Sequence, residues 1–167
     1  CGSNLTYAFA PNYGVLVISG WGSMYDYYYD TLNNSDDYYY DDDTVPEENK
    51  APWYEERSSI RTVIIEDGVT SIGRAAFYDC TNLKNVILPK NITKITNRMF
   101  YDCENLSYIS LPDSITRIEF NTFYNCTSLT KITFSGENNL KIISQNAFEN
   151  CKLEGTIDLS SICVISD

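Results

Sequence analysis

The chain has 167 residues, of which 43% are hydrophobic and 21% charged, and its formal net charge is −11. This length fits one ordinary domain and is too short for two large ones. The acidity argues against nucleic acid as a partner, because phosphate binding needs clustered Lys and Arg. We find neither an apolar run long enough to cross a bilayer nor the layout of a signal peptide in the sequence.

The acidity belongs to the N-terminal third. Residues 1–57 carry eleven acidic and two basic side chains, whereas residues 58–167 carry twelve and ten. In this first part the segment VLVIS is strand-like and the GWG that follows it is a turn. We expect Trp21 and Trp53 to cover the open apolar end of the next part of the chain. This N-terminal part would then be a small β-containing cap.

A tyrosine- and aspartate-rich insertion, YDYYYDTLNNSDDYYYDDD, occupies residues 25–43. A solvated loop is one interpretation, and Tyr27→Ala would then cost under about 0.5 kcal/mol. A protein-contact loop is another, because Tyr offers a large contact area at low entropic cost. The tyrosines of this second interpretation are Tyr27, Tyr28, Tyr29, Tyr38, Tyr39 and Tyr40. Calcium binding by Asp41, Asp42 and Asp43 is the third, although consecutive Asp side chains diverge and the spacing of an EF-hand is missing.

Four repeats follow from Ser58. Three units of 23 residues begin SSIRTVII, TNLKNVIL and ENLSYISL, and a fourth of 25 residues begins TSLTKITF. Apolar residues recur at fixed offsets, and a unit this short must stack on copies of itself to bury its apolar face. The Leu-x-x-Val-x-Leu segment alternates like a short strand, and Pro89 and Pro112 end the pairing. Each repeat therefore forms one turn of a solenoid.

This pattern closely resembles the BspA-like leucine-rich repeat family, whose units run roughly L-x-x-I-x-L-P-x-x-(I/V)-x-x-I-x-x-x-A-F-x-x-C. The match covers residues 58–151, and CGSNLTYAF, GVLVISGWGSM and PWYEERSSI are similar to the N-terminal cap of the family. The resemblance implies a leucine-rich repeat solenoid with short parallel β-strands, one per 23-residue repeat, and a loop or short-helical opposite face. Residues 1–57 would be the cap with its insertion, and residues 58–167 the solenoid, with four repeats and a truncated fifth.

The chain stops within this fifth unit, before the positions of its Phe and Cys. A solenoid needs a polar terminal cap to remain soluble. We therefore expect further repeats to follow Asp167.

Four of the six cysteines close successive repeats. They are Cys80, Cys103, Cys126 and Cys151. Stacked turns would place them about 4.8 Å apart, which is compatible with disulfides. Side chains in a parallel ladder point the same way, however, and Cys is a good small core residue. We expect buried free thiols, and we disfavour zinc because there is no His and no C-x-x-C pair.

Cys1 and Cys163 stand outside this ladder, at opposite ends of the stack, and cannot pair. Cys163 should occupy the outward position held by threonines in earlier repeats, namely Thr70, Thr93 and Thr116. Cys1 belongs either to the cap pattern of the family or to the mature start of a bacterial lipoprotein, where the first Cys carries the lipid. The sequons at Asn4, Asn33, Asn91, Asn105 and Asn125 would matter only in a eukaryotic secretory pathway.

Catalysis finds little support in the sequence. The absence of His removes the commonest general base and every Ser-His or Cys-His arrangement. Paired carboxylates occur only in the insertion, and there is no P-loop or dinucleotide fingerprint. We therefore expect no enzyme and assign no catalytic, cofactor-binding or metal-binding residue.

The candidate partner-binding residues lie on the strand face. If Leu83, Val86 and Leu88 point inward, the residues between them point outward. The same register selects Thr62, Ile64, Asn85, Ile87, Tyr108, Ser110, Lys131 and Thr133. This row is either a protein-binding face or an ordinary solvated sheet face. A second row, Tyr78, Tyr101 and Tyr124, forms either an exposed aromatic ridge or a half-buried layer.

The family resemblance implies a non-enzymatic, secreted or cell-surface module that adheres to host matrix proteins or to other cells. Its partner would be an extracellular or cell-surface protein, and we expect the module itself to be a monomer. The acidic insertion would attract a basic partner and affect mainly the association rate. The alternative is a structural spacer whose repeats project another domain from the cell surface.

Overall fold

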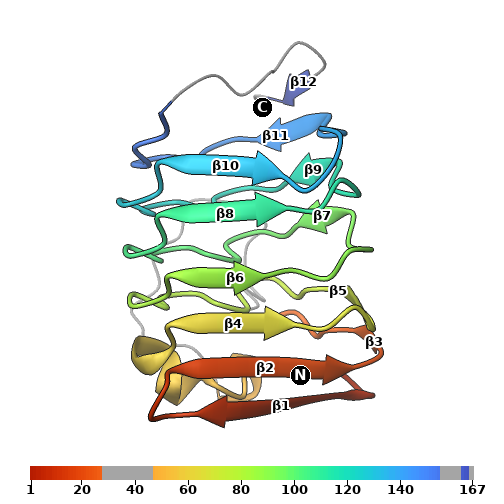
Figure 1. Cartoon of the computed structure of the whole chain (residues 1–167), viewed down its shortest axis with the longest axis vertical. Coiled ribbons are helices and arrows are strands. Elements are labelled where there is room, and N and C mark those ends of the chain that lie inside the picture. Colours follow the sequence, from red (N-terminus) through yellow and green to blue (C-terminus); the bar gives the residue numbers. More distant parts are fainter. Residues whose placement is uncertain (28–46, 155–162, 166–167) are drawn as a thin grey trace.

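The protein is a stack of short strands, shown by a computed structural model that describes residues 1–27, 47–154 and 163–165 (Figure 1). Two 3-10 helices, η2 (Glu47–Asn49) and η3 (Tyr54–Ser59), lie beside the N-terminal end of the stack. Within the described ranges we find no helix that is long and apolar enough to span a membrane.

One side of the stack is formed by the longer strands. They are β1 (Leu5–Ala10), β2 (Val15–Gly20), β4 (Thr62–Ile65), β6 (Asn85–Ile87), β8 (Tyr108–Leu111) and β10 (Lys131–Phe134). The hairpin β1–β2 is antiparallel, whereas β2, β4 and β6 pair in parallel, as do β8 and β10. Strand β8 follows β6 in the stack (Figure 1). The four-stranded sheet β1–β2–β4–β6 therefore joins the N-terminal segment to the first repeats, and β8 and β10 form a separate pair. The boundary drawn at residue 57 falls inside η3.

A second set of strands lies on the other side of each turn. It comprises β3 (Gly22–Ser23), β5 (Val69–Ser71), β7 (Lys94–Ile95), β9 (Arg117–Ile118), β11 (Ile142–Ser144) and β12 (Cys163–Ile165). The expectation of one strand per repeat is therefore wrong. The reason is that turns stacked in register also align their Ile-x-x-Ile segments, so that Ile95 pairs with Ile118 and Ile118 with Ile143.

The register of β12 corrects a further expectation. Cys163 pairs with Ile142, and Ile142 pairs with Arg117. Cys163 therefore aligns one residue later than the position of Thr116, because the last unit has altered spacing.

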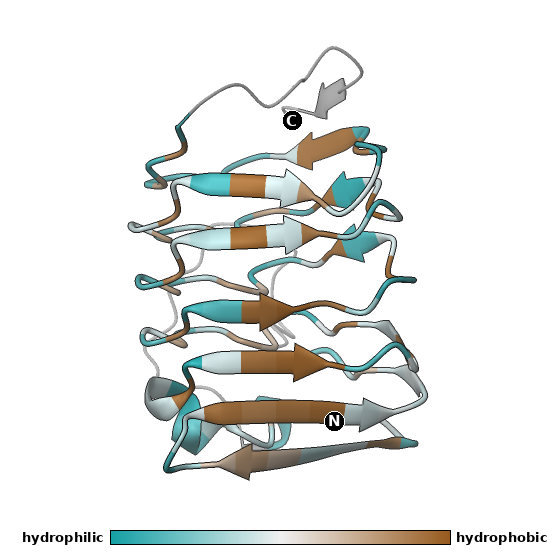
Figure 2. Cartoon of the chain, in the orientation of Figure 1, coloured by the Kyte–Doolittle hydropathy of each residue, from teal (hydrophilic) through white to brown (hydrophobic). Residues whose placement is uncertain are grey.

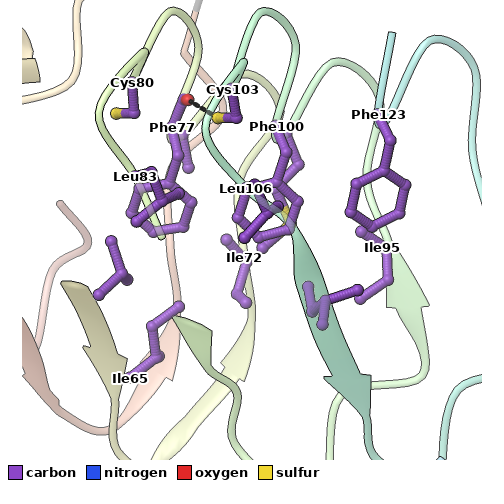
Figure 3. Close-up of a cluster of buried hydrophobic side chains, with 14 of the residues drawn as sticks. Ile65, Ile72, Phe77, Cys80, Leu83, Ile95, Phe100, Cys103, Leu106 and Phe123 are labelled. Atoms are coloured by element: carbon purple, nitrogen blue, oxygen red, sulfur yellow. Dashed lines mark hydrogen bonds between the residues drawn. The ribbon is translucent and has the colours of Figure 1, made fainter. Parts of the chain in front are cut away.

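The core is a spine of stacked aromatic rings (Figure 3). Phe77, Phe100 and Phe123 are fully buried, and their ring centroids lie 5.6 and 5.4 Å apart with nearly parallel planes. Trp53 extends the spine at the N-terminal end, with its ring centroid 5.8 Å from that of Phe77. Its indole nitrogen donates a hydrogen bond to the carbonyl of Ala76 (2.8 Å). Trp53 therefore covers the first repeat, as predicted.

Trp21 does not cover the first repeat, and the prediction for this residue is wrong. Its side chain is 68% exposed. The flanking Gly20 and Gly22 adopt φ values of 107° and 105°, which L-residues rarely reach. The GWG segment is thus a turn that presents Trp21 to solvent.

In the repeats, a loop leads from each strand of the second set to the next longer strand. The Phe in this loop is flanked by two residues whose backbone is in the left-handed region. Asp79, Asp102, Asn125 and Asn150 occupy the second of these positions, with φ between 54° and 62°. Asp and Asn tolerate this conformation better than most residues. Successive loops are joined by backbone hydrogen bonds, such as Phe100 N–H to the carbonyl of Thr122 (2.9 Å).

The cysteine ladder consists of free thiols, as predicted. Cys80, Cys103 and Cys126 are fully buried, and Cys151 is half-buried. Three of the thiols donate to the carbonyl of the Phe in the preceding repeat, at 3.2 Å for Cys103 and 3.1 Å for Cys126 and Cys151 (Figure 3). Burial raises the pKa of the Cys80 and Cys103 thiols, which keeps them protonated.

Candidate protein-binding face

The eight predicted strand-face residues lie on four successive strands of one side of the stack. They come in pairs from β4, β6, β8 and β10, and none of them is buried. Their neighbours Val63, Ile65, Ile109 and Leu111 are buried in the core. The alternation of inward and outward residues therefore follows the predicted register.

An aliphatic column runs across three of the strands. Val17 pairs with Ile64, and Ile64 pairs with Ile87. Ile87 is 56% exposed, whereas Val17 and Ile64 are half-buried. We call Val17, Ile64 and Ile87 the aliphatic column.

Sequence reasoning missed Val17. The alternation in VLVIS indicates a strand with Leu16 and Ile18 inward, so that Val17 should point outward. The parallel pairing that places β2 beside β4 links residues more than 40 positions apart, and periodicity carries no signal for it.

The strands β8 and β10 carry a polar cluster instead. The hydroxyl groups of Tyr108 and Thr133 are 2.8 Å apart and share a hydrogen bond, and Lys131 pairs in register with Tyr108. Hydrogen bonding to Thr133, and then to Ser110, lowers the pKa of Tyr108, and the charge of Lys131 acts in the same direction. The strand face thus has an aliphatic part on β2, β4 and β6 and a polar part on β8 and β10 (Figure 2).

Tyr27 is not available as a contact residue, which corrects the prediction made for it. Its side chain is only 5% exposed and packs edge-on against Trp53, with ring centroids 5.8 Å apart. Desolvation raises the pKa of Tyr27 well above its usual value. Tyr27 therefore belongs to the core and not to a solvated loop. The remaining tyrosines of the insertion, Tyr28, Tyr29, Tyr38, Tyr39 and Tyr40, lie outside the described residues, as do Asp41, Asp42 and Asp43.

The second tyrosine row forms a half-buried layer. Tyr78, Tyr101 and Tyr124 stack on one another with centroid distances of 5.2 and 4.7 Å and interplanar angles of 15° and 9°. Each ring therefore covers a face of its neighbour, and the row presents ring edges to solvent more than ring faces. In the described part of the chain, His, Cys, Asp and Glu side chains form no group of three or more arranged to hold a metal ion.

The stacked parallel strands, repeated Leu and Phe positions and open strand face define a leucine-rich repeat protein. Residues 51–167 match the BspA type leucine rich repeat region family in six copies, so the chain belongs to this family. The match begins before Ser58 and includes Trp53, which extends the aromatic spine.

Solved structures of bacterial leucine-rich repeat proteins resemble the chain. A protein from Eubacterium ventriosum is 26% identical, with a TM-score of 0.53, and the match covers 88% of this chain and 44% of that one. A leucine rich cell surface protein from Faecalibacterium prausnitzii is 18% identical, with a TM-score of 0.44, over 92% of this chain and 46% of that one. The chain spans less than half the length of either protein. The search of curated proteins finds no significant match.

Proposed function

We propose that this chain is a non-enzymatic protein-binding module of a secreted or cell-surface protein, and that it binds its partner through the strand face. In this proposal the repeats form a solenoid, residues 1–57 cap its N-terminal end, and adhesion to matrix proteins or other cells is the role. The family implies such roles by analogy of fold, which is a weaker argument than one from a site.

The exposed aliphatic column is the observation that supports the proposal. A polar residue at a solvent-facing position of a sheet costs little, because its side chain remains in contact with water. Ile87 nevertheless exposes more than half of its side chain, and Val17 and Ile64 extend the same apolar surface. Tyr108, which is 45% exposed, adds an aromatic side chain on the next strand. Apolar and aromatic anchors on a rigid sheet are the groups that dominate binding energies at interfaces.

A binding experiment with two matched pairs of variants tests this proposal. The chain is immobilised and presented with extracellular matrix proteins and with whole cells. Ile87→Asp and Tyr108→Ala should each weaken saturable binding by more than about 1 kcal/mol. Trp21→Asp and Tyr25→Ala are the controls, because these side chains are 68% and 57% exposed and belong to no strand of this face. Equal losses in the controls would reject the strand face as the binding site.

The structural spacer is the second candidate, and the same experiment discriminates it. A spacer needs only a stable stack that holds its two ends apart. Absence of saturable binding to every matrix protein and cell type would favour the spacer.

A further inference from the structure

Three exposed cations lie at, or directly before, the first residues of strands β4, β6 and β10. Arg61 and Lys84 lie side by side, because Thr62 pairs with Asn85 and the amide of Lys84 donates to the carbonyl of Arg61 (2.9 Å). Lys131 begins β10, two repeats further along. All three side chains are exposed. We call Arg61, Lys84 and Lys131 the basic edge.

Among the described residues, no carboxylate lies within ion-pair distance of the basic edge, and the same holds for Arg117, Lys141 and Lys152 on other parts of the surface. Other cations do have such partners. The pairs are Arg57–Asp79 (3.1 Å), Lys90–Asp67 (3.4 Å), Lys94–Glu119 (3.2 Å) and Arg74–Asp26 (3.9 Å). Acidic side chains outnumber basic ones by 23 to 12 in this chain, yet Arg61 and Lys84 are neighbouring cations without a carboxylate partner among the described residues.

The charges at the far ends of the same strands are mixed, because Lys90 follows β6 and pairs with Asp67 (3.4 Å), whereas carboxylates follow β4 and β8. Glu66 follows β4 directly, and Asp113 lies two residues after β8, and both are exposed. The aliphatic column runs between these acidic residues and the basic edge. A segment that lies along β4 therefore meets a cation, an aliphatic group and a carboxylate in that order.

We propose that the partner contributes an acidic segment, with its carboxylates against Arg61 and Lys84 and its aliphatic side chains on the aliphatic column. This inference rests on the proposed function, because it names the chemistry of the partner at the same face. Alternate residues of an extended segment lie about 6.6 Å apart on one side. Ile64 lies three residues after Arg61, roughly 10 Å along an extended chain, and the long Arg61 side chain spans the difference. An Asp or Glu two residues from an Ile, Leu or Val therefore reaches both groups.

The aliphatic column favours a protein segment over an anionic polysaccharide, which has few apolar groups to place there. The negative charge of the proposed partner is also opposite to the sign expected from the net charge of the chain, −11, which would select a basic partner. The charges next to the binding face decide the sign of the partner's charge, because screening limits the interaction of exposed charges to about 10 Å at 0.1 M salt.

A selection experiment on the whole chain tests the acidic segment. A phage-displayed library of random linear peptides is panned against the immobilised 167-residue protein. We expect enrichment of peptides with Asp or Glu two residues from Ile, Leu or Val. The most enriched peptide is then synthesised with a fluorophore, and its dissociation constant is measured by fluorescence anisotropy at about 0.1 M and about 1 M salt.

The variants give the expected fold-changes. The double variant Arg61→Glu/Lys84→Glu should raise the dissociation constant about tenfold, and Arg61→Gln/Lys84→Gln should raise it less. The control Arg117→Glu/Lys141→Glu carries the same change in net charge on the side of β9 and β11, and it should change the constant by less than about twofold. Circular dichroism shows whether each variant remains folded.

Several results would overturn the inference. They are enrichment of basic peptides, enrichment without charge bias, no enrichment, and binding that Arg61→Glu/Lys84→Glu leaves unchanged. If Ile87→Asp weakens such charge-independent binding, the strand face remains the site and only the acidic partner is rejected. Binding that neither variant affects would reject the proposed function as well. Saturable binding of a sulfated polysaccharide that needs Arg61 and Lys84 but not Ile87 would also reject a protein segment.

Discussion

The middle repeats and the N-terminal segment both bury aromatic rings, but the rings pack differently in the two regions. In the repeats each Phe ring is covered by the ring of the next turn, and the planes of Phe77, Phe100 and Phe123 are nearly parallel. At the N-terminal end the spine stops at Trp53, which Tyr7 and Tyr27 meet edge-on at centroid distances of 5.6 and 5.8 Å. A stack of identical turns buries its middle through repetition, but its end must be covered by residues that do not repeat.

The same contrast appears in hydrogen bonding. In the repeats, backbone and thiol groups of one turn bond to the next turn at recurring positions. At the N-terminal end, the Tyr7 hydroxyl reaches the carbonyl of Pro52 (3.2 Å), but that of Tyr27 is buried without a hydrogen-bond partner in the described part of the chain. The non-repeating end therefore leaves a buried hydroxyl without a hydrogen bond. Substitutions there distinguish best between the packing of this end and that of the repeats.

The largest expected difference concerns thiol reactivity. The thiols of Cys80 and Cys103 are buried, and their raised pKa suppresses the reactive thiolate, so their labelling should require unfolding. Cys151 is half-buried, so its thiol should react in the native protein as pH rises and the thiolate forms. We expect labelling rates to differ by about a thousandfold or more.

Mass spectrometry of the native protein after alkylation measures these rates at each site. Denaturation without reductant should then expose all six thiols. Fewer than six would indicate disulfides. Fast native labelling of Cys103 would show that the repeats open locally.

Removal of a central ring is expected to have the next largest effect. Phe100→Ala should lower the free energy of unfolding by about 3 to 5 kcal/mol, because the cavity lies between two stacked rings. Tyr101→Ala in the same turn removes a half-buried ring and should cost less. Urea unfolding followed by circular dichroism measures both values. Equal losses would mean that the spine contributes no more than the outer tyrosine row.

Tyr27→Ala tests whether the N-terminal end of the stack contributes as much to stability as its middle. We expect a loss of about 2 to 4 kcal/mol in the free energy of unfolding, because the ring packs against Trp53 in the core. Tyr25→Ala is the control, since Tyr25 is 57% exposed and should cost under about 0.5 kcal/mol. A negligible effect of Tyr27→Ala would restore the interpretation of this residue as part of a solvated loop.

Tyr27→Phe should have the smallest effect and the opposite sign. The substitution keeps the ring against Trp53 and removes a buried hydroxyl that has no hydrogen-bond partner. Desolvation of an unpaired hydroxyl is unfavourable, so we expect a gain of up to about 1 kcal/mol in the free energy of unfolding. A loss of similar size, measured by urea unfolding, would show that the hydroxyl is hydrogen-bonded in solution.

The sequence by itself determined the repeat and its core. A 23-residue period with Leu, Ile, Phe and Cys at fixed offsets can bury its apolar side chains only by stacking, so the strand face, the buried Phe residues and the cysteine ladder follow from the period. The outward positions follow as well, because alternation along a strand separates Ile87 from its buried neighbours. These are local inferences, and each depends on residues within one unit.

Only the tertiary structure decided how the non-repeating residues take part. Tyr27 lies in a stretch whose composition indicates a solvated loop, yet its ring is in the core, because Trp53 offers an apolar surface that no repeat covers. The pairing of β2 with β4 adds Val17 to the aliphatic column, and the neighbouring turns bring Arg61 beside Lys84. Contacts between residues distant in the chain depend on which backbones pair, and that is set by the free energy of the whole stack and not by any local pattern.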